Sequence, residues 1–195
     1  MAIQIKQRIT RAEFEAFIAQ PENADSTFEL VAGEVFAVVS NNYSSMIAAR
    51  ILTFIGMYLL QQNIGYVTGS DGGYIVQGES YIPDVGFISK TRQPEPNHDA
   101  YNPQAPDLAV EVMSPTDSEK KLLLKVSNYL AAGTVVWVVY PEECEVHIHR
   151  PEKGANTLDM NGTISGEPVL PGFTLAVKDI FPEDSANDDD KESTD

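Results

Sequence analysis

Apolar residues recur at two periods along this chain, and the two periods predict three helices among many short strands. The helical period, with apolar side chains three and four residues apart, runs through three segments that begin or end at capping residues. The longest segment is apolar on most faces, so we expect it to be buried against a sheet. The predicted helices run over residues 11–20 after the capping box Thr10-Arg11-Ala12-Glu13, from Asn41–Ser45 to about Gln62, and from Thr116 or Asp117 to Ala131-Ala132-Gly133.

Segments of alternating or continuous apolar residues, separated by glycine and proline, predict the strands. The first two form a hairpin between residues 27 and 39, with its turn at Ala32-Gly33. Residues 108–113 are almost continuously apolar, as in a strand covered on both faces, except that Glu111 interrupts them. Further strands are predicted at residues 66–68, 74–77, 81–89, 134–140 and 145–150, with weaker ones near Thr157 and Val169, while residues 90–105 are predicted to be an exposed loop.

The order of these elements predicts one domain of the α/β class (α+β), with a mixed sheet flanked by helices and preceded by a helix and a β-hairpin. A chain of 195 residues with 43% apolar residues and a mean hydropathy of -0.19 fits a globular domain with a substantial core. We assign residues 1–182 to this domain. Residues 183–195 hold seven acids and one lysine, which predicts an acidic, disordered tail.

The composition argues against several classes of protein. One cysteine, Cys144, excludes an internal disulfide and a cysteine-rich zinc site. The amino end lacks the charged and then apolar pattern of a secretory signal. The longest apolar stretch, Met46 to Leu60, is interrupted by Arg50 and Thr53 and is too short to span a bilayer, so we expect no membrane segment and a cytoplasmic location.

Two acids stand inside segments that otherwise read as buried strands. Asp84 follows Pro83, and Glu111 lies between Val110 and Val112. Because burying a bare carboxylate is costly, each acid needs a cation, a partner or a function. If their strands pair, both carboxylates converge on one ion, and with the carbonyl of Val112 and waters they form the oxygen shell that Mg²⁺ or Mn²⁺ prefers.

Ordinary readings of the same residues stay open. Asp84 could be a turn residue after Pro83, and Lys125 on the third predicted helix could be a solvated lysine, although its neighbours are apolar. A serine or cysteine hydrolase is not indicated, since the chain has no Gly-X-Ser-X-Gly segment. His147 and His149 share a strand face, but with no third ligand in view we interpret them as surface residues.

Several segments, in this order along the chain, resemble the Uma2 family, formerly called DUF820 and abundant in cyanobacteria. The resemblance covers roughly residues 10–180. That family is similar to the PD-(D/E)XK nucleases, so the resemblance implies a restriction endonuclease-like core of a mixed sheet with flanking helices. The segments that carry it are Phe28-Glu29-Leu30-Val31-Ala32-Gly33-Glu34, Ile82-Pro83-Asp84-Val85, Pro106-Asp107-Leu108-Ala109-Val110-Glu111-Val112-Met113-Ser114-Pro115, Lys125-Val126-Ser127-Asn128-Tyr129-Leu130-Ala131-Ala132-Gly133 and Val136-Trp137-Val138-Val139-Tyr140-Pro141.

The resemblance implies that Asp84 is the first metal ligand and Glu111 the second, with Mg²⁺ or Mn²⁺ as cofactor. The lysine that usually follows the second acid by two residues would fall at Met113, so the standard motif is broken here. Lys125 matches the position on the next helix to which this family has moved the lysine. The resemblance therefore implies a catalytic set of Asp84, Glu111 and Lys125.

Further candidates accompany this set. Glu34 is implied as an additional carboxylate by the Gly-Glu pair of the family. Asp107 shares a strand face with Glu111, and Tyr129 lies one helical turn beyond the lysine. Family members often carry a histidine ahead of the long helix, where Tyr43 or a neighbouring serine stands here, so we assign no role to a histidine.

Our first functional hypothesis is a metal-dependent DNA endonuclease that hydrolyses phosphodiester bonds. The net charge of -16 argues against a strong non-specific grip on DNA, because the chain without its tail still carries -16 minus -6, or -10. A second hypothesis is therefore a nuclease-fold module that binds or regulates without cutting, and a third is a homodimeric structural protein with the long helix at its interface. In the first hypothesis, substrate phosphates meet a basic edge made of Lys90, Arg92, Lys120 and Lys121.

Overall fold

The N-terminal half begins as its local sequence predicts. In the computed structural model, which describes residues 8–115 and 117–182, the capping box is formed: the Thr10 hydroxyl accepts a hydrogen bond from the Glu13 N–H, and the Glu13 carboxylate accepts one from the Thr10 N–H. Asn41 caps the long helix by accepting from the Ser44 N–H at 2.8 Å. The hairpin turn lies at Ala32-Gly33, where both residues have positive φ.

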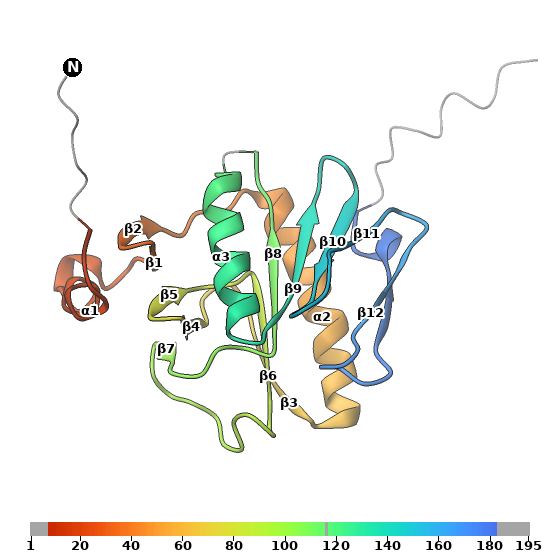
Figure 1. Ribbon diagram of the computed structural model, residues 1–195, viewed down its shortest axis with the longest axis horizontal. Helices are drawn as coiled ribbons and strands as arrows, with labels where there is room; N and C mark the ends of the chain where they lie inside the picture. Colours follow the sequence, from red (N-terminus) through yellow and green to blue (C-terminus); the bar gives the residue numbers. More distant parts are fainter. Residues whose placement is uncertain (1–7, 116, 183–195) are drawn as a thin grey trace, which may run out of the picture.

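The described residues form three helices and three sheets (Figure 1). The helices are α1 (Arg11–Ile18), α2 (Asn42–Gln62) and α3 (Glu119–Ala131), with single 3₁₀ turns at η1 (Pro21–Asn23) and η2 (Val177–Asp179). A six-stranded sheet has the order β11 (Asn156–Leu158), β10 (Glu145–His149), β9 (Val135–Tyr140), β8 (Leu108–Val112), β6 (Val85–Ser89) and β3 (Gly65–Thr68). A five-stranded sheet has the order β2 (Glu34–Ala37), β1 (Phe28–Val31), β5 (Glu79–Tyr81), β4 (Gly73–Val76) and β7 (Tyr101–Asn102), and β12 (Thr163–Ser165) pairs with β13 (Thr174–Ala176).

The six-stranded sheet is the predicted mixed sheet. Its central strands β8 and β9 run parallel, because α3 crosses over between them, whereas β6 runs antiparallel to β8. The helices α2 and α3 cover opposite faces of this sheet (Figure 1). This arrangement buries β8 completely and places its two faces in two separate cores.

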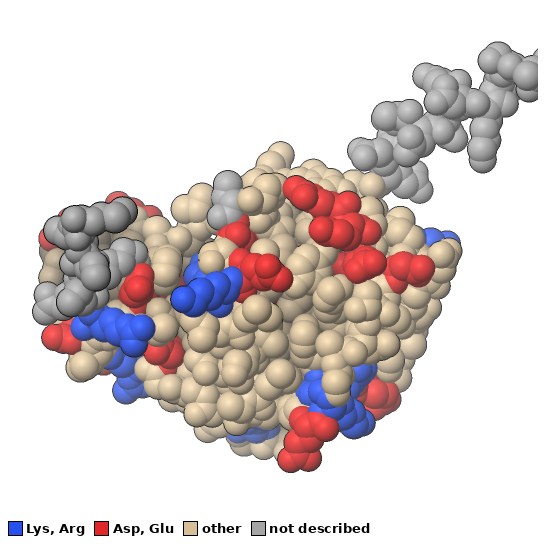
Figure 2. Space-filling model, turned by 45° about the horizontal axis from the view of Figure 1, so that its top comes forward, with Lys and Arg blue, Asp and Glu red and all other residues tan. Residues whose placement is uncertain are grey.

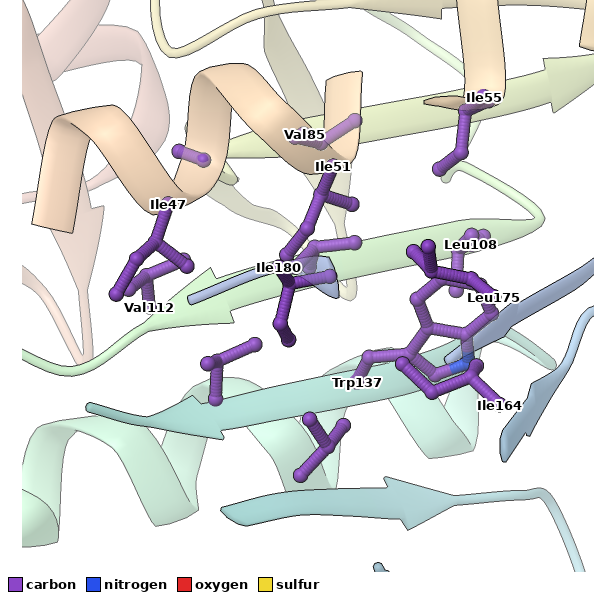
Figure 3. Packing of buried hydrophobic residues seen from close by; sticks show 14 of the residues in the cluster. Ile47, Ile51, Ile55, Val85, Leu108, Val112, Trp137, Ile164, Leu175 and Ile180 are labelled. Carbon is purple, nitrogen blue, oxygen red and sulfur yellow. The ribbon is translucent and has the colours of Figure 1, made fainter. Parts of the chain in front are cut away.

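The core beneath α2 holds the sheet in place. Ile47, Ile51 and Ile55, spaced one turn apart, point from α2 onto β6, β8 and β9 (Figure 3). Ile164 and Leu175 of the β12–β13 pair close the same core (Figure 3). Each such fully buried aliphatic side chain contributes about 1.5–3 kcal/mol of hydrophobic free energy. By length and composition alone α2 could cross a bilayer, but its isoleucines lie in this core.

The core on the other face forms between α3, the six-stranded sheet and the five-stranded sheet. Leu122, Val126 and Tyr129 of α3 are buried against Ala109 and Val138 of β8 and β9. Residues of the five-stranded sheet, Val31, Tyr74, Val76 and Tyr81, belong to the same cluster. Because strand residues alternate between faces, Glu111, two residues after Ala109 on β8, also faces α3.

The start of α3 differs from the prediction. Ser118, and not Asp117, is the N-cap, and its hydroxyl accepts from the Lys121 N–H at 3.4 Å. Asp117 instead accepts from the Ser114 N–H at 2.8 Å, which stabilises the turn that leads from β8 into the helix. Thr116, the other predicted cap, lies outside the described residues, as does the predicted tail.

Three strand predictions were wrong. Residues 81–89 were expected as one strand, but the chain leaves the five-stranded sheet after β5 and enters the six-stranded sheet at β6. Pro83 lies in this break, since proline has no N–H with which to continue a ladder. Val169 lies in a turn between β12 and β13, and the loop predicted at 90–105 contains β7, which pairs with β4.

Candidate active site

A cavity of about 230 Å³ opens where β8 ends, between α3 and the five-stranded sheet. Three parts of the chain supply its walls: the N-terminal hairpin with the loop after it, the segment from Ile82 through Asp84 together with β8, and the first turns of α3. Four carboxylates and two lysines line it, so negative charge is in excess. These charged residues are Glu29, Asp84, Glu111, Asp117, Lys121 and Lys125.

The pairing of β6 with β8 brings Asp84 and Glu111 together. In this antiparallel pair Val85 lies opposite Val110, so the residues that precede and follow them come to the same end of the sheet. The Asp84 Oδ2 accepts a hydrogen bond of 2.7 Å from the Val112 N–H. The convergence of the two acids therefore rests on strand register and on one side-chain to backbone bond.

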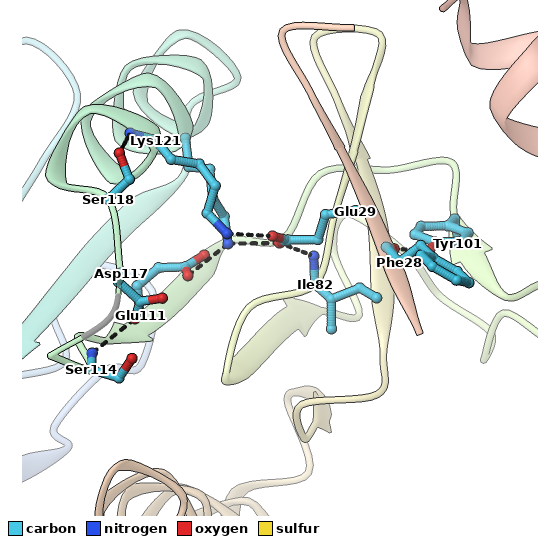
Figure 4. A network of polar contacts seen from close by, with 10 residues as sticks. Phe28, Glu29, Ile82, Tyr101, Glu111, Ser114, Asp117, Ser118 and Lys121 are labelled. Atoms are coloured by element: carbon cyan, nitrogen blue, oxygen red, sulfur yellow. Dashed lines mark hydrogen bonds and ion pairs between the residues drawn. The ribbon is translucent and has the colours of Figure 1, made fainter. Parts of the chain in front are cut away.

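Lys125 reaches this pair from α3. Its Nζ lies 2.7 Å from Glu111 Oε2 and 2.7 Å from Glu29 Oε1, and only 3% of the residue is exposed. Lys121, one turn earlier on α3, lies 3.5 Å from Glu29 Oε2 (Figure 4). Burial favours the neutral amine, but the charges of Glu111 and Glu29 outweigh it and raise the pKa of Lys125 above its ordinary value. Lys125 is therefore a protonated ammonium group.

The carboxyl groups differ in how far the protein compensates their charge. Burial raises the pKa of Glu111 to about 7, although the ammonium of Lys125 opposes the shift. Burial also raises the pKa of Asp84, despite its hydrogen bond from the backbone. For Glu29 burial acts in the same direction, but Lys125 and further donors outweigh it and lower the pKa. The shortage of positive charge therefore lies at Asp84 and Glu111.

One oxygen of Glu111 is buried without a hydrogen-bond partner. Oε2 faces Lys125, whereas Oε1 has no partner in the described part of the chain. The Tyr129 hydroxyl is buried beside this carboxylate without meeting hydrogen-bond geometry, and burial, the charge of Glu111 and a side-chain interaction with Glu111 raise its pKa well above the ordinary value. Buried polar atoms without partners are uncommon, and either the Tyr129 hydroxyl or a coordinated cation would satisfy this oxygen.

These features fit a divalent cation held by two carboxylates. Within residues 8–115 and 117–182, no three His, Cys, Asp or Glu side chains form a complete ligand cluster. An ion bound by Asp84 and Glu111 would take its remaining ligands from water, backbone or substrate oxygens, as Mg²⁺ commonly does.

Asp107 and two of the predicted phosphate contacts lie at the other end of the sheet. Asp107 accepts from the Ser89 N–H at 2.7 Å and pairs with Arg92 at 3.0 Å, so its role is structural. At roughly 3.3 Å per residue, Asp107 lies about 13 Å along β8 from Glu111. Lys90 follows β6 at the same far end. The expectation that Lys90 and Arg92 border the site was therefore wrong, whereas Lys121 lines the cavity.

The hairpin supplies a carboxylate that the sequence reading missed. Glu29 lines the cavity, whereas Glu34 begins β2 and is not among the lining residues. Glu29 stands between Phe28 and Leu30 in a strand, which is the kind of apolar context that singled out Glu111. The signal was present, but only the three-dimensional structure connects it with Lys125.

A sequence profile of the Uma2 family, whose description is "Putative restriction endonuclease", matches residues 12–178. The chain belongs to the Uma2 family. This match confirms the resemblance seen in the sequence motifs, and it includes Asp84, Glu111 and Lys125 within its bounds. No curated protein matches the chain.

A solved structure has the same fold as this Uma2 chain. It is described as that of "a putative nuclease belonging to DUF820 from Anabaena variabilis ATCC 29413". The TM-score is 0.78, and the match covers 89% of this chain and 97% of that chain at 22% sequence identity. The comparison confirms the predicted nuclease-type fold of a mixed sheet with flanking helices.

Proposed function

We propose that this Uma2 protein is a Mg²⁺- or Mn²⁺-dependent endonuclease that hydrolyses phosphodiester bonds in DNA. The observation that carries the proposal is the convergence of Asp84, Glu111 and Lys125 in one cavity. Asp84 directly precedes β6, Glu111 lies in β8 and Lys125 lies in α3. Membership of a family whose description is "Putative restriction endonuclease" supports it. The cytoplasmic location expected from the sequence agrees with a DNA substrate.

Asp84 and Glu111 would hold the ion. Burial raises the pKa of both acids, which fits carboxylates whose charge is only partly compensated, and Glu111 Oε1 has no partner of hydrogen-bond geometry among the described residues. When bound, a divalent cation lowers the pKa of a coordinated water and offsets charge on a phosphoryl oxygen. The excess of carboxylates over lysines in the cavity favours the capture of such a cation.

Lys125 supplies a fixed positive charge. Because it is protonated and held between two carboxylates, it does not serve as the proton acceptor for the attacking water. Its ammonium group instead orients that water or stabilises the negative charge that develops on the scissile phosphate. Lys121, whose side chain is 25% exposed, lies in the same cavity and is placed to contact a substrate phosphate.

The alternative, a nuclease-fold module that binds without cutting, is favoured by the charge around the site. A neighbouring cavity of about 750 Å³ is lined by four acids and, among its lining residues, by no lysine or arginine. Figure 2 shows acidic side chains gathered over the β9–β10 end of the molecule. Such a surface repels DNA phosphates, so a DNA substrate would have to approach the site from another side. The acids of the cavity are Asp117, Glu119, Glu142 and Glu143.

DNA cleavage by matched variants tests the proposal. We expect wild-type protein to cleave DNA with Mn²⁺, and Asp84→Asn and Glu111→Gln to lose at least about a hundredfold in rate, as when a group acting in the transition state is removed. The control is Glu22→Gln, an exposed acid in η1 that loses the same charge but lines neither cavity. Thermal melting shows whether each variant is folded. Undiminished cleavage by both site variants contradicts the assignment, and absence of cleavage by the wild type favours the binding module.

A further inference from the structure

Glu29 connects three parts of the site through one carboxylate. It lies in β1, its side chain is 4% exposed, and it extends from the five-stranded sheet towards α3. Its Oε1 accepts hydrogen bonds from Lys125 Nζ at 2.7 Å and from the Ile82 N–H at 2.9 Å, and its Oε2 lies 3.5 Å from Lys121 Nζ (Figure 4). Ile82 is two residues before Asp84. Glu29 thus joins the hairpin, the segment that carries Asp84 and the helix that carries the lysines.

Stability alone gives little reason for this arrangement. Removing two charges from water is costly, and well-packed apolar residues in place of a buried ion pair are often neutral or stabilising. Glu29 is buried in a strand between Phe28 and Leu30, where an apolar residue would be ordinary. The geometry that its charge imposes on its partners is therefore the more informative property.

That geometry holds Lys125 midway between two carboxylates. Its ammonium group lies at the same distance, 2.7 Å, from Glu29 and from Glu111. If Glu29 lost its charge, the acids that remain near the ammonium would be Glu111 and Asp84, whose pKa the charge of Lys125 already affects. Electrostatic attraction would then draw the lysine onto the two carboxylates proposed to hold the cation.

We propose that Glu29 is a positioning residue of the metal site, which holds Lys125 away from Asp84 and fixes the segment from Ile82 to Asp84. This role rests on the proposed function, because it concerns a cation bound by Asp84 and Glu111. It makes the five-stranded sheet a part of the active site, since β1 of that sheet carries Glu29.

Isothermal titration with Mn²⁺ in a double-mutant cycle tests this role without measuring cleavage. We expect Glu29→Gln to weaken Mn²⁺ binding by about tenfold or more, as is usual for residues that orient metal ligands. In a Lys125→Met background the same change should alter the affinity by less than about twofold, because no ammonium is left to be positioned. Wild-type affinity in Glu29→Gln contradicts the role, and so does equal weakening in both backgrounds, which would indicate a general loss of negative charge.

Two further variants make the test specific. Glu79→Gln is the matched control, since Glu79 lies in the neighbouring strand β5 and accepts a hydrogen bond from the Gly33 N–H, and its affinity should equal that of the wild type. Glu29→Asp keeps the charge but is one methylene shorter, so it cannot reach both Lys125 and Ile82, and weakened binding is expected. Wild-type affinity in Glu29→Asp contradicts the role even if Glu29→Gln fails to fold.

Titration of the wild type with Mn²⁺ distinguishes failure of the proposed metal site from failure of the positioning role of Glu29. If it binds no Mn²⁺, with or without an oligonucleotide, the proposed metal site is wrong and the role of Glu29 falls with it. If the wild type binds Mn²⁺ and the Glu29 variants bind equally well, only the positioning role is wrong.

Discussion

Glu111 combines two properties that reduce the stability of a folded protein, a buried carboxyl group and an oxygen without a partner among the described residues, and the burial raises its pKa. Side chains of this kind are concentrated at functional sites, where the environment adjusts their charge to a task. Its neighbours Asp84 and Lys125 share the cavity, and each is held by a short hydrogen bond or ion pair. Glu111 is therefore a residue whose placement favours a functional task over stability.

The pKa of Glu111 predicts how the stability of the metal-free protein depends on pH. Its folded-state pKa of about 7 lies above the ordinary 4.5, so the folded protein binds more protons than the unfolded chain between these values. The stability that protonation of Glu111 contributes is fully present below pH 4.5 and is lost as pH rises through 7. Between these values the free energy of unfolding falls by an amount on the order of 1 kcal/mol per pH unit.

Urea unfolding of the wild type and Glu111→Gln in the presence of a chelator checks this dependence. The free energy of unfolding of the wild type, minus that of the variant, should fall from pH 5 to pH 7 and then level off. A difference that stays constant across this range contradicts the assigned pKa.

At the scale of elements, the local sequence predicted the helices and the central strand but not the sheet that each strand joins. Capping residues and apolar periods act within one turn, so α1, α2, α3 and β8 lie within a few residues of their predicted bounds. Pro83 marks the break after residue 81 locally, but the sheet that each part joins depends on contacts such as that of the Ile82 N–H with Glu29, 53 residues away. No local pattern contains such a contact, and for the same reason Glu29 was missed although its strand was predicted.

Two glycines give a matched test of the packing described here. A Cβ at Gly65 would collide with the Ile88 carbonyl oxygen and the Phe87 ring where β3 pairs with β6. Gly65→Ala should therefore lower the free energy of unfolding by about 1–3 kcal/mol through overpacking. Gly56 in α2 has nothing within 4 Å of such a Cβ. Gly56→Ala should therefore raise the free energy of unfolding by about 0.5–1 kcal/mol, because alanine has the higher helix propensity. Chemical denaturation measures both, and equal effects of the two changes contradict the packing.

At the scale of the whole molecule, charge would govern how a DNA substrate reaches the proposed site. The chain carries -16, and acids line the larger cavity beside that site, so the proposed function needs cations such as Lys121 along the path of the substrate. The predicted domain limit at residue 182 and the homodimer through α2 stay predictions. The exposed Met57 and Leu60 on α2 are compatible with such an interface.

Removal of residues 183–195 tests the charge argument. The truncation removes a charge of -6, so DNA binding should be strengthened several-fold at low ionic strength, and the gain should shrink as salt screens it. Fluorescence anisotropy with a labelled duplex and the non-cleaving variant Glu111→Gln measures both affinities. Equal affinities at low salt would show that the tail does not affect DNA binding.

The metal site is the central claim, and isothermal titration of Mn²⁺ into the wild type and Glu111→Gln tests it most directly. We predict that the wild type binds one Mn²⁺ and that Glu111→Gln, folded as judged by thermal melting, binds none in the same concentration range. The titration is repeated with an oligonucleotide, because substrate phosphates are among the expected ligands. Absence of binding by the wild type under both conditions, or equal binding by the variant, contradicts the account.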